Sequence, residues 1–275
     1  MGFRYAICSE IFKDWSLRDA CRLAQSLGYS GFEVAPFMWG ESIDSISPGE
    51  RAEFRRTIEG EGLVCSGLHW LLVTPKGLHL TTEDSVLREK SWSYLGRLID
   101  FCGDLGGPLM ILGSPYQRNA PEGQTVEEAL RRLAEGLARL APQAAAREVT
   151  LLMEAVSSQE TNVVTTLEEA VSIVDTVGHP SVQTMFDFHN AADQGGDFLS
   201  LPERYFEKIR HVHVNEVDGR HPSTGEIDFS RVLQLLKDRE YQGWLSLEVF
   251  DFEAGPERIA RASIDYLKSV EASLA

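Results

Sequence analysis

The sequence has few of the features that attach a protein to membranes or nucleic acids. No apolar run approaches the roughly 20 residues that a membrane-spanning helix needs. Basic residues are scarce, since 26 Lys and Arg stand against 42 Asp and Glu, and the net charge is −16. A field of that sign repels phosphate backbones and anionic lipid surfaces. We therefore expect neither nucleic acid nor a membrane as a partner.

Paired cysteines and targeting signals are also missing. The cysteines are Cys8, Cys21, Cys65 and Cys102, and no C-x-x-C pair occurs, so the sequence predicts neither a zinc knuckle nor a thioredoxin-type site. The opening stretch MGFRYAICSEIF has no signal-peptide pattern. We expect reduced thiols and a cytoplasmic protein.

Short β-rich runs alternate with longer amphipathic stretches along the whole chain. The strand-like runs are residues 4–8, 31–35, 63–68, 109–113, 149–154, 182–187, 211–214 and 244–249, and helical patterns include 16–28, 47–62, 125–146 and 166–178. Such alternation predicts a parallel sheet of βαβ units. Eight units in 275 residues favour an α/β fold, a closed (β/α)₈ TIM barrel that forms a single domain over residues 1–275. The alternative is an open doubly wound sheet, but the stretch CSEIFKDW lacks the Gly-rich phosphate loop expected after its first strand.

Polar side chains stand where four consecutive predicted strands end. Glu154 ends the fifth strand, Asp187 the sixth, His213 the seventh and Glu248 the eighth. In a TIM barrel these positions lie on one rim, which is where active sites are found. Each acid follows an apolar run, and a charge in such a place needs compensation. We interpret the four residues as the ligands of one divalent metal ion.

The ligand types indicate which metal would bind. Three carboxylates and one imidazole suit Mn²⁺, Mg²⁺ or Co²⁺ better than an ion that prefers thiolates. Such ions take about six ligands, so substrate oxygens can complete the shell. The metal would then act as a Lewis acid on a bound α-hydroxy carbonyl and acidify the neighbouring C–H bond.

The spacing of these four residues and the stretches around them resemble a known family. The separations are 33, 26 and 35 residues, and they occur with GYSGFEV, EAVSSQETNVVTTLEEA, HVHVNE and GWLSLEVF. Together they are similar to the sugar phosphate isomerase/epimerase family, which comprises xylose-isomerase-like TIM barrels, and most of all to its ketose 3-epimerases.

The resemblance implies a metal-dependent sugar isomerase or epimerase that acts on a ketose or keto-sugar. It implies Mn²⁺ as the ion and gives Glu154 and Glu248 a second role as the acid/base pair. An epimerase must remove a proton from one face of a carbon and return one to the other, through an enediolate, and two carboxylates can do both transfers. Family members are often oligomers, so a homo-oligomer is expected.

Substrate contacts are also implied by the resemblance. Glu160 matches a substrate-binding glutamate, while His189 and Arg220 each lie one position away from where the family places a histidine and an arginine. We expect these residues, and His69 after the third strand, to contact substrate. His211 lies one layer below His213 on the same strand face, where a hydrogen-bonded interior histidine is expected.

Other functions remain open at this point. A metal-dependent lyase, either a dehydratase or a deglycosidase on an oxidised sugar or related polyol, could use the same ion and base. An apurinic endonuclease needs more histidine ligands and a basic face. A sugar- or metal-binding protein without activity would not need a pair of proton carriers. His79, His179 and His221 are interpreted as surface loop residues.

Overall fold

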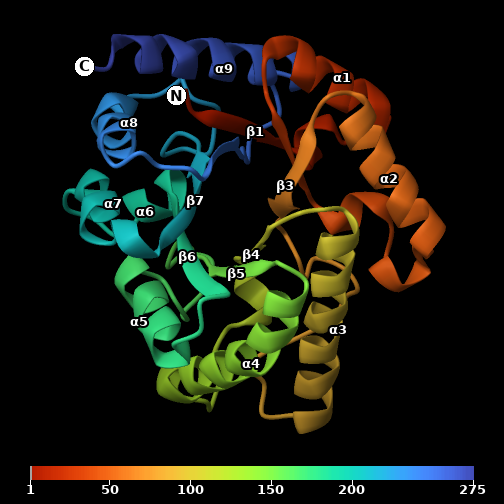
Figure 1. Ribbon diagram of the computed structural model, residues 1–275. Coiled ribbons are helices and arrows are strands. Elements are labelled where there is room, and N and C mark those ends of the chain that lie inside the picture. The colour runs from red at the N-terminus through yellow and green to blue at the C-terminus, as the bar shows by residue number, and fades with distance from the viewer. Residues whose placement is uncertain (1) are drawn as a thin grey trace.

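The computed structural model describes residues 2–275, and within them eight parallel strands form a closed barrel (Figure 1). Each strand pairs with its sequence neighbours, and the barrel closes where Tyr5 of the first strand pairs with Leu245 of the last. The strands are β1 (Arg4–Cys8), β2 (Gly31–Val34), β3 (Val64–Leu68), β4 (Leu109–Leu112), β5 (Thr150–Met153), β6 (Val182–Asp187), β7 (Ile209–Val214) and β8 (Trp244–Leu247). The predicted TIM barrel is confirmed.

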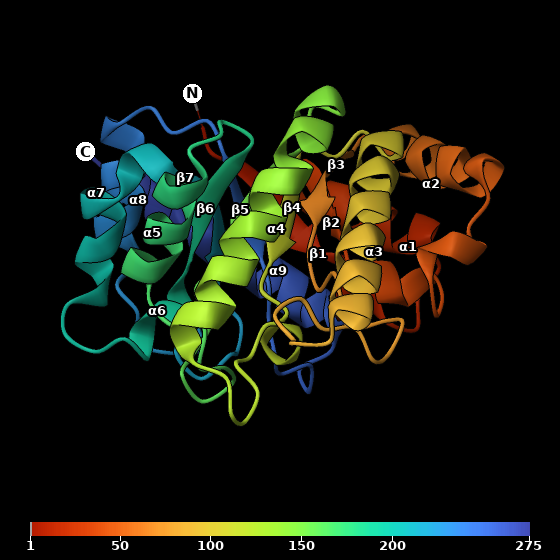
Figure 2. The same ribbon diagram turned by 90° about the horizontal axis from the view of Figure 1, so that it is seen from below.

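Helices cover the outside of the barrel and run alongside the strands (Figure 2). They are α1 (Leu17–Leu27), α2 (Pro48–Gly60), α3 (Ser85–Asp104), α4 (Val126–Ala146), α5 (Leu167–Val177), α6 (Phe188–Ala192), α7 (Leu201–Arg204), α8 (Phe229–Asp238) and α9 (Pro256–Ser273). Three of them begin with a reciprocal capping box, in which Ser47, Thr125 or Thr166 pairs with a glutamate three residues later. Within the described chain, none of these helices is long and apolar enough to cross a membrane.

The two ends of the chain meet at the closure of the barrel. Figures 1 and 2 both place the N- and C-termini on the same side of the molecule. The Glu271 carboxylate near the end of α9 accepts hydrogen bonds from the Phe3 amide and the Tyr5 hydroxyl, each at 2.8 Å. The last helix is thereby fastened to the first strand.

The barrel interior changes from apolar to polar along its axis. A buried apolar cluster, contributed by five different strands, comprises Ala6, Leu109, Ile111, Leu152, Met185 and Trp244. Further along the strands the buried interior residues are polar, and Glu33, His211, His213 and Ser246 are all fully buried there. The polar layer lies toward the carboxyl ends of the strands, which is where the predicted site residues follow.

Candidate metal centre and active site

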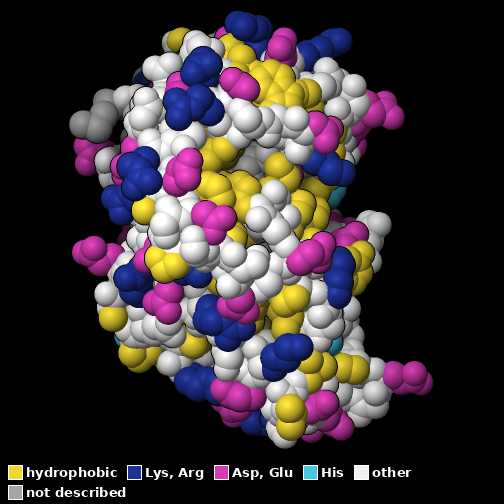
Figure 3. All heavy atoms as spheres, turned by 90° about the vertical axis from the view of Figure 1, so that its right-hand side faces the viewer, with side chains coloured by type: hydrophobic (Ala, Val, Ile, Leu, Met, Phe, Trp, Pro, Cys, Tyr) yellow, Lys and Arg dark blue, Asp and Glu magenta, His cyan; other side chains and the backbone are white. Residues whose placement is uncertain are grey.

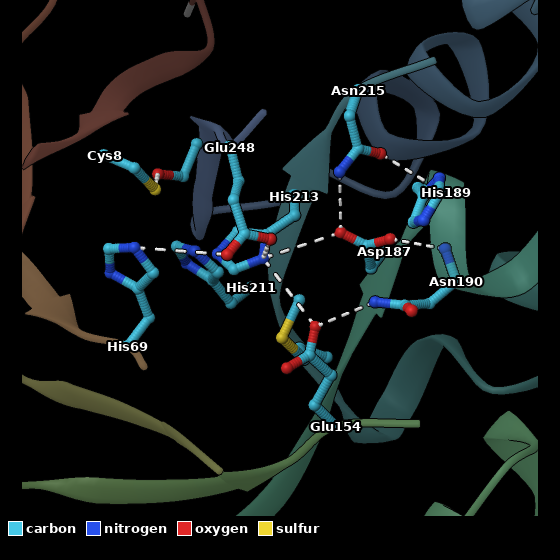
Figure 4. Close-up of polar contacts among 12 residues, drawn as sticks. Cys8, His69, Glu154, Asp187, His189, Asn190, His211, His213, Asn215 and Glu248 are labelled. Atoms are coloured by element: carbon cyan, nitrogen blue, oxygen red, sulfur yellow. Dashed lines mark hydrogen bonds and ion pairs between the residues drawn. The ribbon is translucent and has the colours of Figure 1, made fainter. Parts of the chain in front are cut away.

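The structure brings Glu154, Asp187, His213 and Glu248 together at the carboxyl end of the barrel (Figure 4). One donor atom from each side chain lies within 4.8 Å of the others. The Nδ1 atom of His213 is 2.9 Å from Glu248 Oε2, 3.6 Å from Asp187 Oδ2 and 3.9 Å from Glu154 Oε1. All four residues are buried, so the negative charges have little water to screen them. The cluster therefore has the composition and spacing of a divalent-cation site.

His213 is oriented by a buried carboxylate behind it. Its Nε2 atom is 2.9 Å from Glu33 Oε1, and Glu33 on β2 is fully buried. An Nε2–H that donates to Glu33 leaves Nδ1 pointing at the three other carboxylates. Nδ1 has no hydrogen-bond partner, although Glu248 Oε2 is close to it. A carboxylate behind an imidazole whose free nitrogen faces acidic oxygens is the usual support for a metal-ligating histidine.

Amide and indole groups hold the three acidic side chains. Asn215 Nδ2 donates to Asp187 Oδ2 at 2.9 Å, and the Asn190 amide N–H donates to Asp187 Oδ1 at 2.7 Å. Asn190 Nδ2 lies 3.3 Å from Glu154 Oε1, and Trp70 Nε1 donates to Glu248 Oε1 at 2.8 Å. These donors leave each acid with a defined orientation toward His213 (Figure 4).

The two glutamates occupy different electrostatic environments. Burial, together with the nearby Glu248 carboxylate, raises the pKa of Glu154 to about 8. Burial also acts to raise the pKa of Glu248, but His213, His69 and the Trp70 indole outweigh it and lower that pKa. Burial acts to lower the pKa of His213, yet Glu248 and Glu33 raise it well above its ordinary value.

A second histidine layer lies beside the cluster. His211 Nε2 is 2.8 Å from Glu33 Oε2, which agrees with the expected interior role of His211. His69 Nε2 is 2.8 Å from Glu10 Oε2 and 4.0 Å from Glu248 Oε1. Burial acts to lower the pKa of His69, but Glu10 and the other carboxylates raise it to about 9. His69 is therefore a charged, buried residue at the edge of the cluster.

The other residues predicted to contact substrate are bonded to groups outside the four-residue cluster. His189 is half-buried, its amide donates to Asn215 Oδ1 at 2.8 Å, and its Nδ1 is 2.7 Å from the Val217 carbonyl oxygen. Arg220 is exposed and is bonded to Asp218, with Nε 2.7 Å from Oδ2. Glu160 is also exposed, and its carboxylate raises the pKa of the Tyr116 phenol through a hydrogen bond.

Aromatic side chains border the cluster. The Trp70 ring is 5.9 Å from Phe37 and 6.4 Å from Phe250, and Phe250 in turn lies 4.9 Å from the His189 ring. Trp70 has a φ of 51°, which is rare for a residue with a side chain and is typical of functional positions. Its indole is thus held beside Glu248 by a strained backbone.

Several site residues were not predicted from the sequence. Glu10, Asn190, Asn215 and the buried Arg118 all contact the cluster or its immediate support, and none of them shows a periodicity that distinguishes it. The interpretation of His221 as a surface residue is wrong, because it is buried and its Nδ1 is 2.9 Å from the Pro222 carbonyl oxygen. His79 and His179 are half-buried.

Comparison with known proteins identifies the class. The model of the family described as "Xylose isomerase-like TIM barrel" matches residues 21–270, and the chain therefore belongs to this family. This confirms the family predicted from the four spaced residues.

Several of the similar curated proteins and solved structures are named as sugar epimerases, and others as putative hydroxypyruvate isomerases. The chain is 24% identical over 240 residues to the probable ketose 3-epimerase of Synechocystis sp., covering 84% of this chain and 77% of the relative. It is 27% identical over 260 residues to the D-psicose 3-epimerase of Enterocloster bolteae, covering 92% of this chain and 84% of that protein. The crystal structure of a D-psicose 3-epimerase in the presence of D-fructose has a TM-score of 0.86 at 19% identity, covering 98% of this chain and all of the other. At this identity the structural match shows that the two proteins share a fold.

Proposed function

We propose that this protein is a divalent-metal-dependent sugar epimerase or isomerase that acts on a ketose or keto-sugar. The observation that carries the proposal is the cluster of Glu154, Asp187, His213 and Glu248, in which two glutamates flank a histidine with an unpartnered Nδ1. The names of the sugar-epimerase relatives support the same class.

We propose that the four residues bind one Mn²⁺ ion, with Mg²⁺ or Co²⁺ as chemically similar alternatives. Three carboxylates and one imidazole match the oxygen-rich preference of these ions. The buried thiol of Cys8 belongs to a neighbouring group with Glu33 and His213, not to the four-residue cluster. When bound, the cation polarises the sugar carbonyl and acidifies the adjacent C–H bond.

Glu154 and Glu248 would exchange protons with the carbon next to that carbonyl. Figure 4 shows them reaching His213 from different sides, and they come from β5 and β8. One carboxylate takes a proton from one face, an enediolate of the sugar follows, and the other carboxylate returns a proton to the opposite face. Trp70 and Asn190 orient the two carboxylates for these transfers.

We propose that His69, His189, Glu160 and Arg220 contact the substrate. His69 and His189 border the cluster, whereas the exposed Glu160 and Arg220 could reach a sugar only at its distal end. Alanine at each should change KM or kcat and leave Mn²⁺ content intact. Loss of the ion from all four variants would show that they belong to the metal site instead.

The surface charge argues against nucleic acid as the substrate. Figure 3 shows acidic and basic side chains interspersed over the side of the molecule that carries α1, α2 and α3, without a continuous basic area. The net charge of −16 acts in the same direction.

The four cysteines are free and buried, which fits the cytoplasmic setting that we propose. We also propose that the protein is a homo-oligomer, and light scattering would measure its size.

The decisive test is a substrate screen with the Mn²⁺-loaded protein. Free ketoses, ketose phosphates, inososes and 3-oxo-glycosides should be offered, and the products analysed by NMR and mass spectrometry. We expect an isomer of unchanged mass, loss of turnover on chelation and recovery when Mn²⁺ is restored. A product that has lost water or an aglycone would instead establish the lyase, and a protein that binds no divalent cation would overturn the proposal.

A further inference from the structure

A fully buried arginine lies behind Glu154 and bonds only to backbone oxygens. Arg118 follows the turn Pro115–Gln117 in the loop between β4 and α4, and its exposed fraction is 0%. Its Nη1 donates to the Glu154 carbonyl oxygen at 2.7 Å and to the Leu112 carbonyl oxygen at 3.0 Å. Its Nη2 donates to the Val164 carbonyl oxygen at 3.1 Å.

These three carbonyls belong to three different segments of the chain, and the Arg118 side chain links the three segments. Leu112 ends β4, Glu154 directly follows β5, and Val164 lies in the loop that leads to α5. A buried guanidinium is costly unless its N–H groups are satisfied. The Arg118 Nε is buried without a hydrogen-bond partner, so the bonds from the two Nη groups must offset that cost. The rigid planar fork of arginine can bind three oxygens at once in a way that the single ammonium of lysine cannot reproduce.

Gly113 leaves room for the Glu154 carboxylate on another side. A Cβ atom at Gly113 would lie 2.3 Å from Glu154 Oε2 and 3.4 Å from its Cδ. The φ of Gly113 is not in the left-handed region, so its backbone would accept an alanine. The missing side chain is therefore explained by the carboxylate that occupies its space.

The two oxygens of the carboxylate are consequently distinguished. Oε2 lies against Gly113, while Oε1 faces Asn190 Nδ2 at 3.3 Å and His213 Nδ1 at 3.9 Å. Asn190 is itself held, because its Oδ1 accepts a hydrogen bond from the Ser157 amide at 3.0 Å. Glu154 is thus constrained at its backbone by Arg118 and at its carboxylate by Gly113 and Asn190.

We propose that Arg118 and Gly113 are positioning residues that hold Glu154 with Oε1 toward the metal cluster and the reacting carbon. The inference rests on the proposed function, since it takes Glu154 to be both a metal ligand and a proton carrier. Arg118 acts through the Glu154 backbone and Gly113 through the space it leaves, so neither contacts the substrate.

The first test replaces Arg118 by lysine, which keeps the positive charge but not the fork. Circular dichroism should show a folded protein, and we expect Mn²⁺ affinity, measured by calorimetry, to fall roughly 10-fold or more and kcat roughly 10²-fold, with KM little changed. Arg147→Lys is the matched control, because Arg147, which follows α4, also donates to a backbone carbonyl, that of Asp100 at 2.9 Å, and bonds to α3 rather than to the loop that carries Arg118. Unchanged affinity and kcat in folded Arg118→Lys protein would overturn the proposal.

A double-mutant cycle separates positioning from a general structural role. If Arg118 acts through Glu154, Arg118→Lys should cause little further loss of kcat in a Glu154→Gln background. If Arg118 only maintains the fold, the two losses should multiply, and that result would overturn the positioning role.

The second test is Gly113→Ala, whose added Cβ would take the space that Glu154 Oε2 now occupies. We expect its crystal structure to show the Glu154 carboxylate turned away from Asn190, with the barrel unchanged. A Glu154 carboxylate that stays in place would overturn the positioning role of Gly113. This readout needs neither substrate nor metal, so a wild-type protein without Mn²⁺ affinity would overturn the proposed function while the position of Glu154 was still tested.

Discussion

At the scale of single residues, the site depends on carboxylates that are buried yet have defined partners. Glu33 is the central example, since it is fully buried and serves both His211 and His213. Burial acts to raise the pKa of Glu33, but these two histidines outweigh it and lower that pKa well below its ordinary value. Glu33 therefore remains ionised and can hold the Nε2–H of His213.

Substitution of Glu33 should weaken the metal site without removing a ligand. Glu33→Gln removes the charge that fixes the His213 ring, so we expect Mn²⁺ affinity to fall roughly 10- to 100-fold in calorimetry. Glu160→Gln is a suitable control, because Glu160 is exposed and should leave the affinity unchanged. Equal Mn²⁺ dissociation constants for Glu33→Gln and wild type would contradict the role of Glu33 in holding the His213 ring.

The chemical roles of Glu154 and Glu248 can be separated from their roles as ligands. Glu→Gln at either position keeps the shape but removes the base, and kcat should fall by roughly 10²–10⁴ if acid–base catalysis is lost. Metal content must be measured in the same variants. Wild-type turnover in D₂O should place deuterium on the product carbon, as seen by NMR.

Two outcomes would change this assignment. A product free of deuterium would indicate either transfer of hydride or a proton fully shielded from solvent. Full activity in metal-loaded Glu248→Gln enzyme would leave Glu248 as a ligand only.

At the scale of elements, loops after neighbouring strands are tied to one another by side chains. Asp193, which follows α6, accepts hydrogen bonds from the Ser158 hydroxyl at 2.7 Å, the Ser157 hydroxyl at 3.0 Å and the Ser158 backbone amide at 2.9 Å. These serines lie in the β5–α5 loop that also carries Glu160. The bonds lower the pKa of Asp193 to about 2, so its stabilising effect is present above its ordinary value near 3.8 and is lost as the pH falls through about 2.

These hydrogen bonds to Asp193 predict how hydrogen exchange in the β5–α5 loop responds to pH. In wild-type protein the Ser158 amide should be protected from hydrogen exchange at both pH 7 and pH 3, since Asp193 stays mostly ionised at both values. Asp193→Ala removes the acceptor and should lose that protection at either pH. Asp197→Ala is the control, because Asp197 pairs with Arg231 at 2.7 Å and should leave Ser158 unaffected. Full protection in Asp193→Ala would show that the loop is held by other contacts.

At the scale of the whole molecule, the barrel gathers buried negative charge in one place. Glu10, Glu33, Glu154, Asp187 and Glu248 are all buried at the carboxyl ends of the strands. Their repulsion acts against folding in the metal-free protein, and a bound cation would relieve it. The site is therefore expected to couple metal binding to global stability.

Thermal unfolding should report this coupling. Mn²⁺ at about 100 times its dissociation constant should stabilise the fold by about 2.7 kcal/mol. That gain corresponds to roughly 5 °C in Tm for a chain of this size, measured by calorimetry. Asp187→Asn removes an anionic ligand and should abolish most of the shift. A Tm independent of Mn²⁺ in wild type would contradict a cation at this cluster.

The sequence by itself determined the barrel and the rim residues, because both depend on local patterns. Apolar runs at strand length alternate with capped amphipathic helices, and such units close in only a few ways. The period of two in a strand places His211 and His213 on one face, and the shared rim of parallel strands groups Glu154, Asp187 and Glu248 with His213.

Only the tertiary structure decided how those residues are supported. Glu33 and His213 are joined at 2.9 Å from opposite regions of the sequence, and the Arg118 fork binds carbonyls from three segments. Such contacts depend on the closure of the barrel and on loop conformations, which have no periodicity to read. The burial that raises the pKa of Glu154 likewise arises only when the strands enclose it, because a charge loses its water only in the packed fold. The carboxylates that raise the pKa of His69 against its burial are also brought to it only by the packed fold.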